Sequence, residues 1–352
     1  MEIILDKYND SFLLKCGVAL SAIFMCITIY ICSGSDLSIH NIFKFEKHKT
    51  ATADAKINIE NNIVAGDITI NMDGRLVIEL PRGVNEQNTT VIKDLLNKRI
   101  YISFPKGFME YDSSSIINNT DVVTNANLSI TENMANITLS LNVLKDCEIC
   151  FDNGLLFMDF FVPAESEKPV IVVDAGHGGD DVGAIEKGIY EKNIDLQICN
   201  KLKEWLDREE FLVYYTRFDD SYPSVEERVD FANELNADLF ISIHSNYFDN
   251  RSIHGTSVLY NVKDKNMYGS EWLSNIMCSE VSNACGTYNK GIVAGNDIHI
   301  VRHSVAPVAL IEVGFMSNDY DYQVLTTEKG QDNVARGIYN GIIRALTELG
   351  KY

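Results

Sequence analysis

The sequence has no excess of positive charge, and it contains no basic cluster. Its 352 residues include 30 Lys and Arg against 50 Asp and Glu, which gives a formal net charge of −20. Proteins that bind nucleic acid present a basic face to the phosphate backbone, so we exclude nucleic acid as a partner. Hydrophobic residues make up 46% of the chain and charged residues 23%. This composition is typical of folded globular proteins, and the length suits about two domains.

A second cysteine pair is also missing. The eight cysteines include a single Cys-x-x-Cys motif, formed by Cys147 and Cys150. A zinc ribbon needs two such pairs, so the motif does not favour a structural metal site. A local disulfide and two unpaired thiols both remain as interpretations.

Charged side chains are absent from one segment near the N-terminus, between Cys16 and Cys32. A helix of this length would measure about 25 Å, which is within the range of one membrane span. No small-x-small cleavage site follows the segment and it has no polar face, which argues against a cleaved signal peptide and a buried core helix. We therefore expect residues 1–15 to be a cytoplasmic tail, 16–33 a transmembrane anchor and 34–55 a linker. Lysines flank the anchor on both sides and do not set its orientation.

Residues 56–163 contain short runs in which apolar and polar residues alternate, separated by turn residues such as Asp73-Gly74. This pattern is typical of a small antiparallel β-sandwich or barrel. No group of His, Asp, Glu or Cys with ligand spacing occurs in it. We interpret this segment as a β-rich binding or spacer domain.

From residue 169 to 352, strand-like runs alternate with helical ones. Such alternation predicts a doubly wound, mostly parallel sheet flanked by helices, in the α/β class. The expected strands are 170–174, 211–216, 238–243, 255–260 and 307–313. The expected helices are about 191–209, 224–236, 267–286 and 328–348.

Polar residues that can bind a metal ion or transfer a proton follow three of these strands or begin a helix. His177 lies between glycines after the first strand, His244 and Glu312 end two other apolar runs, and Glu191 begins the first helix. The carboxyl ends of parallel strands form the ligand-bearing edge of such a sheet. Two imidazoles and one carboxylate are a common catalytic zinc set that leaves a position open for water, and a second carboxylate can act as general base.

These residues belong to blocks that occur in a specific order along the chain. The blocks are GHGG (176–179), YEKN (190–193), TRFDD (216–220), ER (227–228), ADLFISIHSN (237–246), HGTSVLYN (254–261) and IEVGFMSN (311–318). Together they resemble the zinc-dependent N-acetylmuramoyl-L-alanine amidases of the amidase-3 type, which are cell-wall hydrolases. The resemblance covers residues 169–349.

The resemblance implies an α/β fold similar to that of zinc exopeptidases, with Zn²⁺ held by His177, Glu191 and His244. It implies hydrolysis of the amide bond between the lactyl group of N-acetylmuramic acid and the L-alanine of peptidoglycan stem peptides, using zinc-activated water with Glu312 as general base. Peptidoglycan is then the partner, and residues 56–163 become a candidate wall-targeting domain. The implied location is the cell membrane, as a single-pass protein whose catalytic domain lies outside the cytoplasm.

Two other functions stay open on the sequence. One is a zinc peptidase of other specificity on the same fold, and the other is a non-catalytic wall-binding protein. The presence of all four candidate site residues disfavours the second. We expect His254, His299 and His303 to be structural rather than substrate-lining. We expect Arg217 and Arg228 to anchor Asp219, Asp220 or Asp230 rather than to touch substrate.

Overall fold

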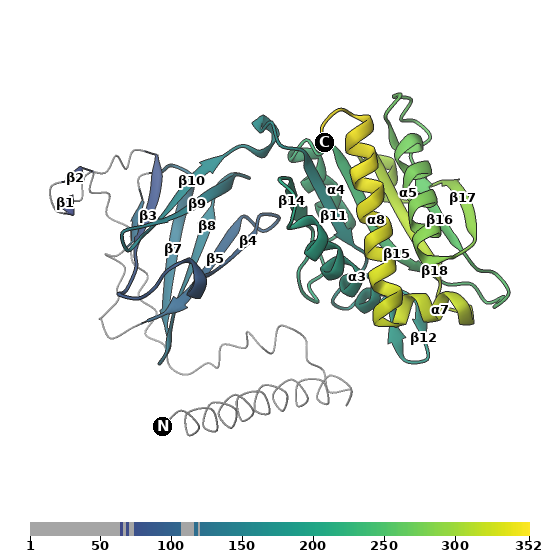
Figure 1. Cartoon of the computed structure of the whole chain (residues 1–352), viewed down its shortest axis with the longest axis horizontal. Helices are drawn as coiled ribbons and strands as arrows, with labels where there is room; N and C mark the ends of the chain where they lie inside the picture. Colours follow the sequence, from purple (N-terminus) through teal and green to yellow (C-terminus); the bar gives the residue numbers. More distant parts are fainter. Residues whose placement is uncertain (1–63, 66–67, 70–73, 107–115, 119) are drawn as a thin grey trace, which may run out of the picture. The chain divides into compact units, whose positions relative to one another are not determined.

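A computed structural model (Figure 1) describes residues 64–65, 68–69, 74–106, 116–118 and 120–352. All of them belong to one compact unit, residues 47–352. The predicted cytoplasmic tail, transmembrane anchor and linker lie outside the described residues. Within the described ranges, every helix falls short of the length and apolarity needed to cross a bilayer.

The β-rich region consists of antiparallel strands. They are β1 (Val64–Ala65), β2 (Ile68–Thr69), β3 (Arg75–Glu79), β4 (Thr90–Asp94), β5 (Arg99–Pro105), β6 (Ile116–Asn118), β7 (Val123–Ile130), β8 (Met134–Leu141), β9 (Asp146–Asp152) and β10 (Leu155–Phe161). Two four-stranded sheets have the orders β6-β3-β10-β9 and β4-β5-β8-β7. Buried and partly exposed residues alternate along β8, as expected for a strand with one face on a core. The described residues between 74 and 161 form antiparallel strands, and a separate, wall-targeting domain at residues 56–163 stays a prediction.

The Cys-x-x-Cys motif lies on β9. Both of its thiols are free, with Cys147 buried and Cys150 exposed. The structure therefore supports two unpaired thiols and excludes the local disulfide.

A six-stranded sheet forms the centre of the α/β region. Its strands are β11 (Val170–Ala175), β14 (Leu212–Tyr215), β15 (Leu239–Asn246), β16 (Thr256–Tyr260), β17 (Asn289–Ala294) and β18 (Val308–Phe315), in the order β14-β11-β15-β18-β16-β17. All neighbouring pairs are parallel except β16 and β18, which are antiparallel. The carboxyl ends of β11, β15 and β18 therefore meet at one edge of the sheet.

Helices cover both faces of this sheet (Figure 1). They are α3 (Glu191–Leu206), α4 (Val225–Glu234), α5 (Ser270–Cys285), α6 (His299–His303), α7 (Asp319–Thr326) and α8 (Glu328–Glu348). Ile171 and Val173 of β11 pack into a core with α3, α5 and α8, whereas Val170 and Val172 pack into a core that includes α4 and α6. Every residue of β11 is buried for this reason, which explains its continuous apolar sequence.

The predicted strands and helices of this region are confirmed, with ends that differ by a few residues. Four elements were not predicted: the strand β17, the helices α6 and α7, and a hairpin of β12 (Ile185–Glu186) and β13 (Ile189–Tyr190). The sheet is mostly parallel, as predicted, and its one antiparallel pair is β16 with β18. This pair does not affect the edge at which the candidate site residues meet.

Candidate metal centre

The loop after β11 turns sharply and presents His177. His177 has a φ of +59°, and Gly178 and Gly179 that follow also have positive φ. Positive φ is costly for a residue with a side chain, so His177 must be held in place by its surroundings. Gly176 has no space for a side chain, because an added Cβ would lie 2.4 Å from the His244 ring. The GHGG block thus lets two histidines from different strands approach each other.

Two buried arginines hold this loop through its backbone. Arg228 donates to His177 O and Ala175 O, each at 2.6 Å. Arg217 donates to Ala175 O at 2.9 Å and to Gly176 O at 2.7 Å. The expectation that these arginines anchor Asp219, Asp220 or Asp230 holds only in part: Arg217 donates to Asp219 O at 3.0 Å. Both arginines also bind carbonyl groups of residues 175–177.

The charge of Arg228 is balanced inside the protein by Asp174, the fifth residue of β11. The two side chains form an ion pair at 2.6 Å, and both are almost fully buried. Burial favours the neutral form of Asp174, but Arg228 and hydrogen bonds from Ser242 and Thr216 outweigh it and lower the pKa to about 2. The strand end and the loop are thereby fixed as one rigid unit.

Glu191 is the first residue of α3, where backbone N–H groups favour a negative charge. Its Oε2 accepts a hydrogen bond from Ala184 N at 2.7 Å, and its Oε1 accepts one from Ser245 N at 3.1 Å. Burial would raise the pKa of Glu191, but hydrogen bonds from His177 and His244 hold it well below the ordinary value. The carboxylate is therefore ionised and fixed at both oxygens.

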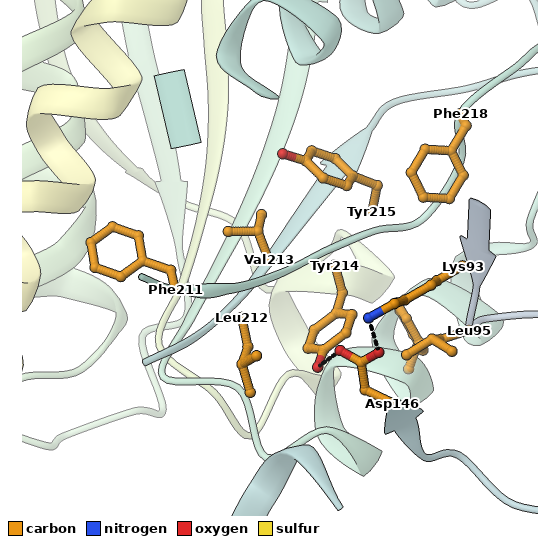
Figure 2. Close-up of a pocket in the computed structure, with 10 residues that line it drawn as sticks. Lys93, Leu95, Asp146, Phe211, Leu212, Val213, Tyr214, Tyr215 and Phe218 are labelled. Atoms are coloured by element: carbon orange, nitrogen blue, oxygen red, sulfur yellow. Dashed lines mark hydrogen bonds and ion pairs between the residues drawn. The ribbon is translucent and has the colours of Figure 1, made fainter. Parts of the chain in front are cut away.

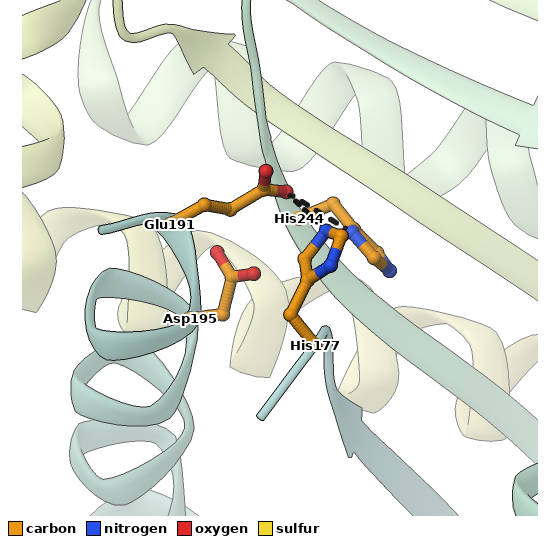
Figure 3. Close-up of side chains that lie close together, drawn as sticks. All are labelled: His177, Glu191, Asp195 and His244. Atoms are coloured by element: carbon orange, nitrogen blue, oxygen red, sulfur yellow. Dashed lines mark hydrogen bonds and ion pairs between the residues drawn. The ribbon is translucent and has the colours of Figure 1, made fainter. Parts of the chain in front are cut away.

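His177, Glu191 and His244 converge on one point (Figure 3). Nε2 of His177 and Nδ1 of His244 each lie 3.1 Å from Oε1 of Glu191. For a tetrahedral zinc ion with bonds of 2.0–2.2 Å, neighbouring ligand atoms are separated by roughly 3.3 Å. The spacing and the two-nitrogen, one-oxygen donor set therefore fit a zinc ion.

The ring nitrogen of His177 on the other side of the imidazole has its own carboxylate partner. Its Nδ1 lies 2.9 Å from Asp181 Oδ2. Such an outer carboxylate fixes the tautomer and the orientation of a metal-binding histidine. Burial alone would lower the pKa of His177, but the hydrogen bonds with Glu191 and Asp181 raise it to about 8.

Glu312 lies beside this cluster because of the strand register. It is paired with His244 between the adjacent parallel strands β18 and β15. Its Oε2 is buried and has no hydrogen-bond partner, although part of the side chain remains accessible. Burial is the main cause that raises the pKa of Glu312 to about 7. A carboxyl group with such a pKa can both accept and release a proton near neutral pH.

The structure thus brings together all four candidate residues, and it adds Asp181, Asp195 and Ser245, which the sequence did not single out. Asp195 is four residues from Glu191 on α3, so helix spacing could have suggested it. Asp181 lies with His177 in a loop, where a spacing of four residues does not predict a contact. Burial, followed by the charge of Glu191, raises the pKa of Asp195 well above its ordinary value.

The remaining histidines lie outside the metal cluster. His254 packs edge-to-face against Tyr288, and His299 stacks on His303 along α6. The cluster of possible metal-holding groups found among the described residues includes none of them.

A separate pocket next to β14 is lined by other residues (Figure 2). Within it, Asp146 accepts hydrogen bonds from Lys93 Nζ at 2.7 Å and from Tyr214 OH at 2.9 Å. None of the metal-cluster residues lines this pocket. Lys93, Asp146 and Tyr214 are thus paired with each other, whereas the Tyr215 hydroxyl, which also lines the pocket, has no hydrogen-bond partner among the described residues. We assign this pocket no role in the chemistry.

Known proteins share this sequence pattern over the α/β region. Residues 171–344 match the amidase-3 family of N-acetylmuramoyl-L-alanine amidases. The germination-specific N-acetylmuramoyl-L-alanine amidase of Bacillus subtilis is 30% identical over 195 residues, which covers 51% of this chain and 81% of that protein. The sporulation-specific amidase of the same organism is 35% identical over 179 residues, which covers 50% of this chain and 68% of that protein. The chain belongs to the N-acetylmuramoyl-L-alanine amidase family.

The amidase also aligns with part of longer relatives. LytC of Bacillus subtilis, an N-acetylmuramoyl-L-alanine amidase, is 30% identical, but the alignment covers 34% of its length. Among solved structures, an N-acetylmuramoyl-L-alanine amidase of Clostridium difficile 630 is 34% identical with a TM-score of 0.49, over 52% of this chain and 98% of that chain. The family match and the two sporulation and germination amidases, rather than this structural likeness, show that the protein is a cell-wall N-acetylmuramoyl-L-alanine amidase.

Proposed function

We propose that this amidase hydrolyses the bond between the lactyl carbonyl of N-acetylmuramic acid and the L-alanine of the stem peptide, with Zn²⁺ as cofactor. His177, Glu191 and His244 would hold the ion, and Glu312 would act as general base. The convergence of two imidazole nitrogens on one oxygen of Glu191 at 3.1 Å carries this proposal. The unpaired, buried Oε2 of Glu312 beside them supports it.

An amide resists hydrolysis because neutral water is a poor nucleophile and an amine is a poor leaving group. Zn²⁺ bound at this site supplies activation of the attacking water and polarisation of the scissile carbonyl. Glu312 takes the proton of the attacking water on its carboxylate and then delivers it to the departing amine nitrogen of L-alanine. Asp181 keeps the proton of His177 on Nδ1, so that Nε2 presents a lone pair to the metal side.

The test is mass spectrometry of peptidoglycan digested by the parent protein and by a His177→Ala variant, with zinc content measured in both. We expect the parent to release peptides that begin with L-alanine and to leave free lactyl groups on the sugar. His177→Ala should lose both zinc and activity. Cleavage between amino acids of the stem peptide would point to the peptidase alternative. Zinc-loaded parent protein that binds the wall but cleaves nothing would point to the non-catalytic one.

We further propose that residues 16–33 anchor the amidase in the cell membrane as a single span, with the catalytic domain outside the cytoplasm. The uncharged segment from Cys16 to Cys32 supports the anchor, and the location of peptidoglycan supports the orientation. In cells, the α/β region should be digested by protease added outside the membrane, and the protein should stay with membranes after an alkaline wash. Release by the wash, or protection from the protease, would contradict the proposal.

Residues 56–163 are proposed to hold the enzyme on the wall. In a sedimentation assay with purified wall fragments, deletion of these residues should weaken binding of a Glu312→Gln protein. Equal binding with and without them would show that the α/β region alone locates the enzyme.

A further inference from the structure

Asp195 is a buried carboxyl group that the proposed chemistry does not use. It lies one helical turn after Glu191 on α3, and residues four apart share one face of a helix. Its side chain is 0% exposed. Figure 3 shows its carboxyl group on the side of α3 that faces His177.

Only one oxygen of Asp195 has a partner. Oδ1 accepts a hydrogen bond from Ser245 Oγ at 3.0 Å, whereas Oδ2 is buried without any hydrogen bond among the described residues. An unpaired polar oxygen in the interior costs free energy, and an ionised carboxylate costs more unless a cation offsets it. Arg217 is near enough to interact with Asp195 electrostatically, but no described group hydrogen-bonds Oδ2. The free oxygen therefore points to a further, positively charged partner in direct contact with the carboxyl group.

The position of the Asp195 carboxyl group relative to the metal cluster points to a divalent cation as this partner. One ligand atom from each of His177, Glu191, Asp195 and His244 can be chosen so that all lie within 4.8 Å of one another. Ligand atoms on opposite sides of one zinc ion are roughly 4 Å apart.

We propose that Asp195 is a fourth protein ligand of the metal ion and binds it through one oxygen of its carboxylate. This inference rests on the metal site of the proposed function. It adds a second carboxylate to the set of two imidazoles and one carboxylate, so that the ligand charges balance a divalent ion. Catalytic zinc sites can reach five-coordination, which leaves a place for water. More oxygen ligands also improve binding of harder ions such as Mn²⁺ relative to a site with one carboxylate.

The test uses the full chain stripped of metal and titrated with Zn²⁺ against a coloured chelator. An Asp195→Asn variant should bind Zn²⁺ at least tenfold more weakly than the parent, since even the loss of an outer partner typically costs about 10–100-fold in metal affinity. Asp321→Asn is the matched control, because Asp321 is also 0% exposed with one unpaired oxygen but is not part of the cluster. It should lower thermal stability and leave zinc affinity within about twofold of the parent's. Parent-like zinc affinity in Asp195→Asn would overturn the proposal.

The visible spectrum of the Co²⁺-loaded parent gives a second reading that needs no variant. Co²⁺ with four protein ligands and water absorbs weakly, whereas tetrahedral Co²⁺ with three protein ligands and water absorbs strongly. We expect a weak spectrum for the parent, a stronger one for Asp195→Asn, and a parent-like one for Ser245→Ala. A strong spectrum in the parent would overturn the proposal even if Asp195→Asn did not fold. If the parent bound no metal at all, the proposed function itself would fail, which is a different result.

Discussion

The β-rich region and the α/β region differ most in what they bury. Among the described residues of the β-rich region, Asp146 is the only buried polar side chain, and all other buried side chains are apolar. The α/β region buries many polar groups, including the carboxyls of Asp174, Glu191 and Asp195. Each buried polar group costs free energy unless it is paired, so the second region carries a cost that the first avoids.

The two regions also differ in whether their buried polar groups have hydrogen-bond partners. Asp146 accepts hydrogen bonds from Lys93, Tyr214 and its neighbouring backbone N–H. At the metal cluster, Asp195 Oδ2 and Glu312 Oε2 have no partner among the described residues. Unpaired buried groups lower the stability of the fold, and their position next to the converging histidines is typical of a functional site. The first region is organised for packing, and the second for a reaction.

Replacing Glu312 should have the largest effect. Glu312→Gln keeps the size of the side chain but cannot accept a proton, so kcat should fall by about 10²–10⁴-fold, the usual contribution of a general base. Zinc content should stay at the parent level, because Glu312 is not one of the three converging ligands. The check is steady-state hydrolysis of peptidoglycan together with metal analysis, and a variant with parent activity would remove Glu312 from the mechanism.

A smaller loss is expected when the support of the His177 loop is weakened. Arg228→Lys keeps a positive charge near Asp174 but cannot bond both Asp174 and His177 O as the guanidinium does. Zinc affinity should fall by about 10–100-fold, as for other outer-shell changes. Arg344→Lys, on the exposed side of α8, is the control and should bind zinc like the parent. Equal affinities in the two variants would mean that the loop does not depend on Arg228.

Alanine substitutions at two glycines with positive φ can distinguish the effect of crowding at the metal site from the effect of backbone strain. A Cβ at Gly183 would lie 2.6 Å from Glu191 Oε2 and 2.8 Å from His177 Cδ2, whereas a Cβ at Gly188 would meet nothing within 4 Å. Both alanine variants should lose about 1 kcal/mol or more of stability from strain. Only Gly183→Ala should also weaken zinc binding. Denaturant unfolding and zinc titration of both variants check this, and equal zinc affinities would contradict it.

The pH dependence of kcat should report Glu312. Its pKa of about 7 is raised mainly by burial, and bound Zn²⁺ would lower it, so the acid limb should have its midpoint at or below about 7. Activity should fall about tenfold per pH unit below that midpoint, because the protonated carboxyl cannot accept a proton. The raised pKa of Glu312 makes stability change with pH in the opposite direction to activity. The contribution of Glu312 to stability is fully present below pH 4.5, its ordinary pKa, and is lost as the pH rises through about 7. In Glu312→Gln this limb of the kcat profile should disappear.

A substitution in the β-rich region should have the smallest effect on the metal site. Asp146→Asn would leave Lys93 without its charged partner and should cost about 1–3 kcal/mol of stability. Zinc affinity and kcat should not change, because Asp146 lies outside the metal cluster. Thermal unfolding and hydrolysis assays check both statements. A loss of zinc affinity would show that the two regions are coupled and would break the comparison.

The sequence predicted the frame of the α/β region and the main candidate residues for clear reasons. The apolar run of β11 and the glycines around His177 are local signals, and His244 and Glu312 end similar runs. The strand β17 was missed because Asn289, Lys290 and Gly291 give it no apolar alternation and it lies at an edge of the sheet. The antiparallel direction of β16 depends on how the chain connects in space, which periodicity does not encode.

The partners of buried polar groups were harder to predict than the groups themselves. Arg217 and Arg228 reach backbone carbonyls of a loop that is distant in the sequence, and residue types do not reveal carbonyl contacts. The roles of Asp181 and Asp195 depend on the side of a turn or helix on which each carboxyl falls. Spacing of four residues was a usable signal for Asp195 only, because Asp181 lies in a loop.

The position of β18 has a consequence for how the enzyme comes into being. It is the last of the described strands along the chain, yet it is inserted between β15 and β16 in the sheet. During synthesis, those two strands must wait for it with open edges, and such long-range pairing is slow to form. Glu312 arrives on that same strand, so the general base that we propose can join the cluster only after all the other described strands of the sheet have been synthesised.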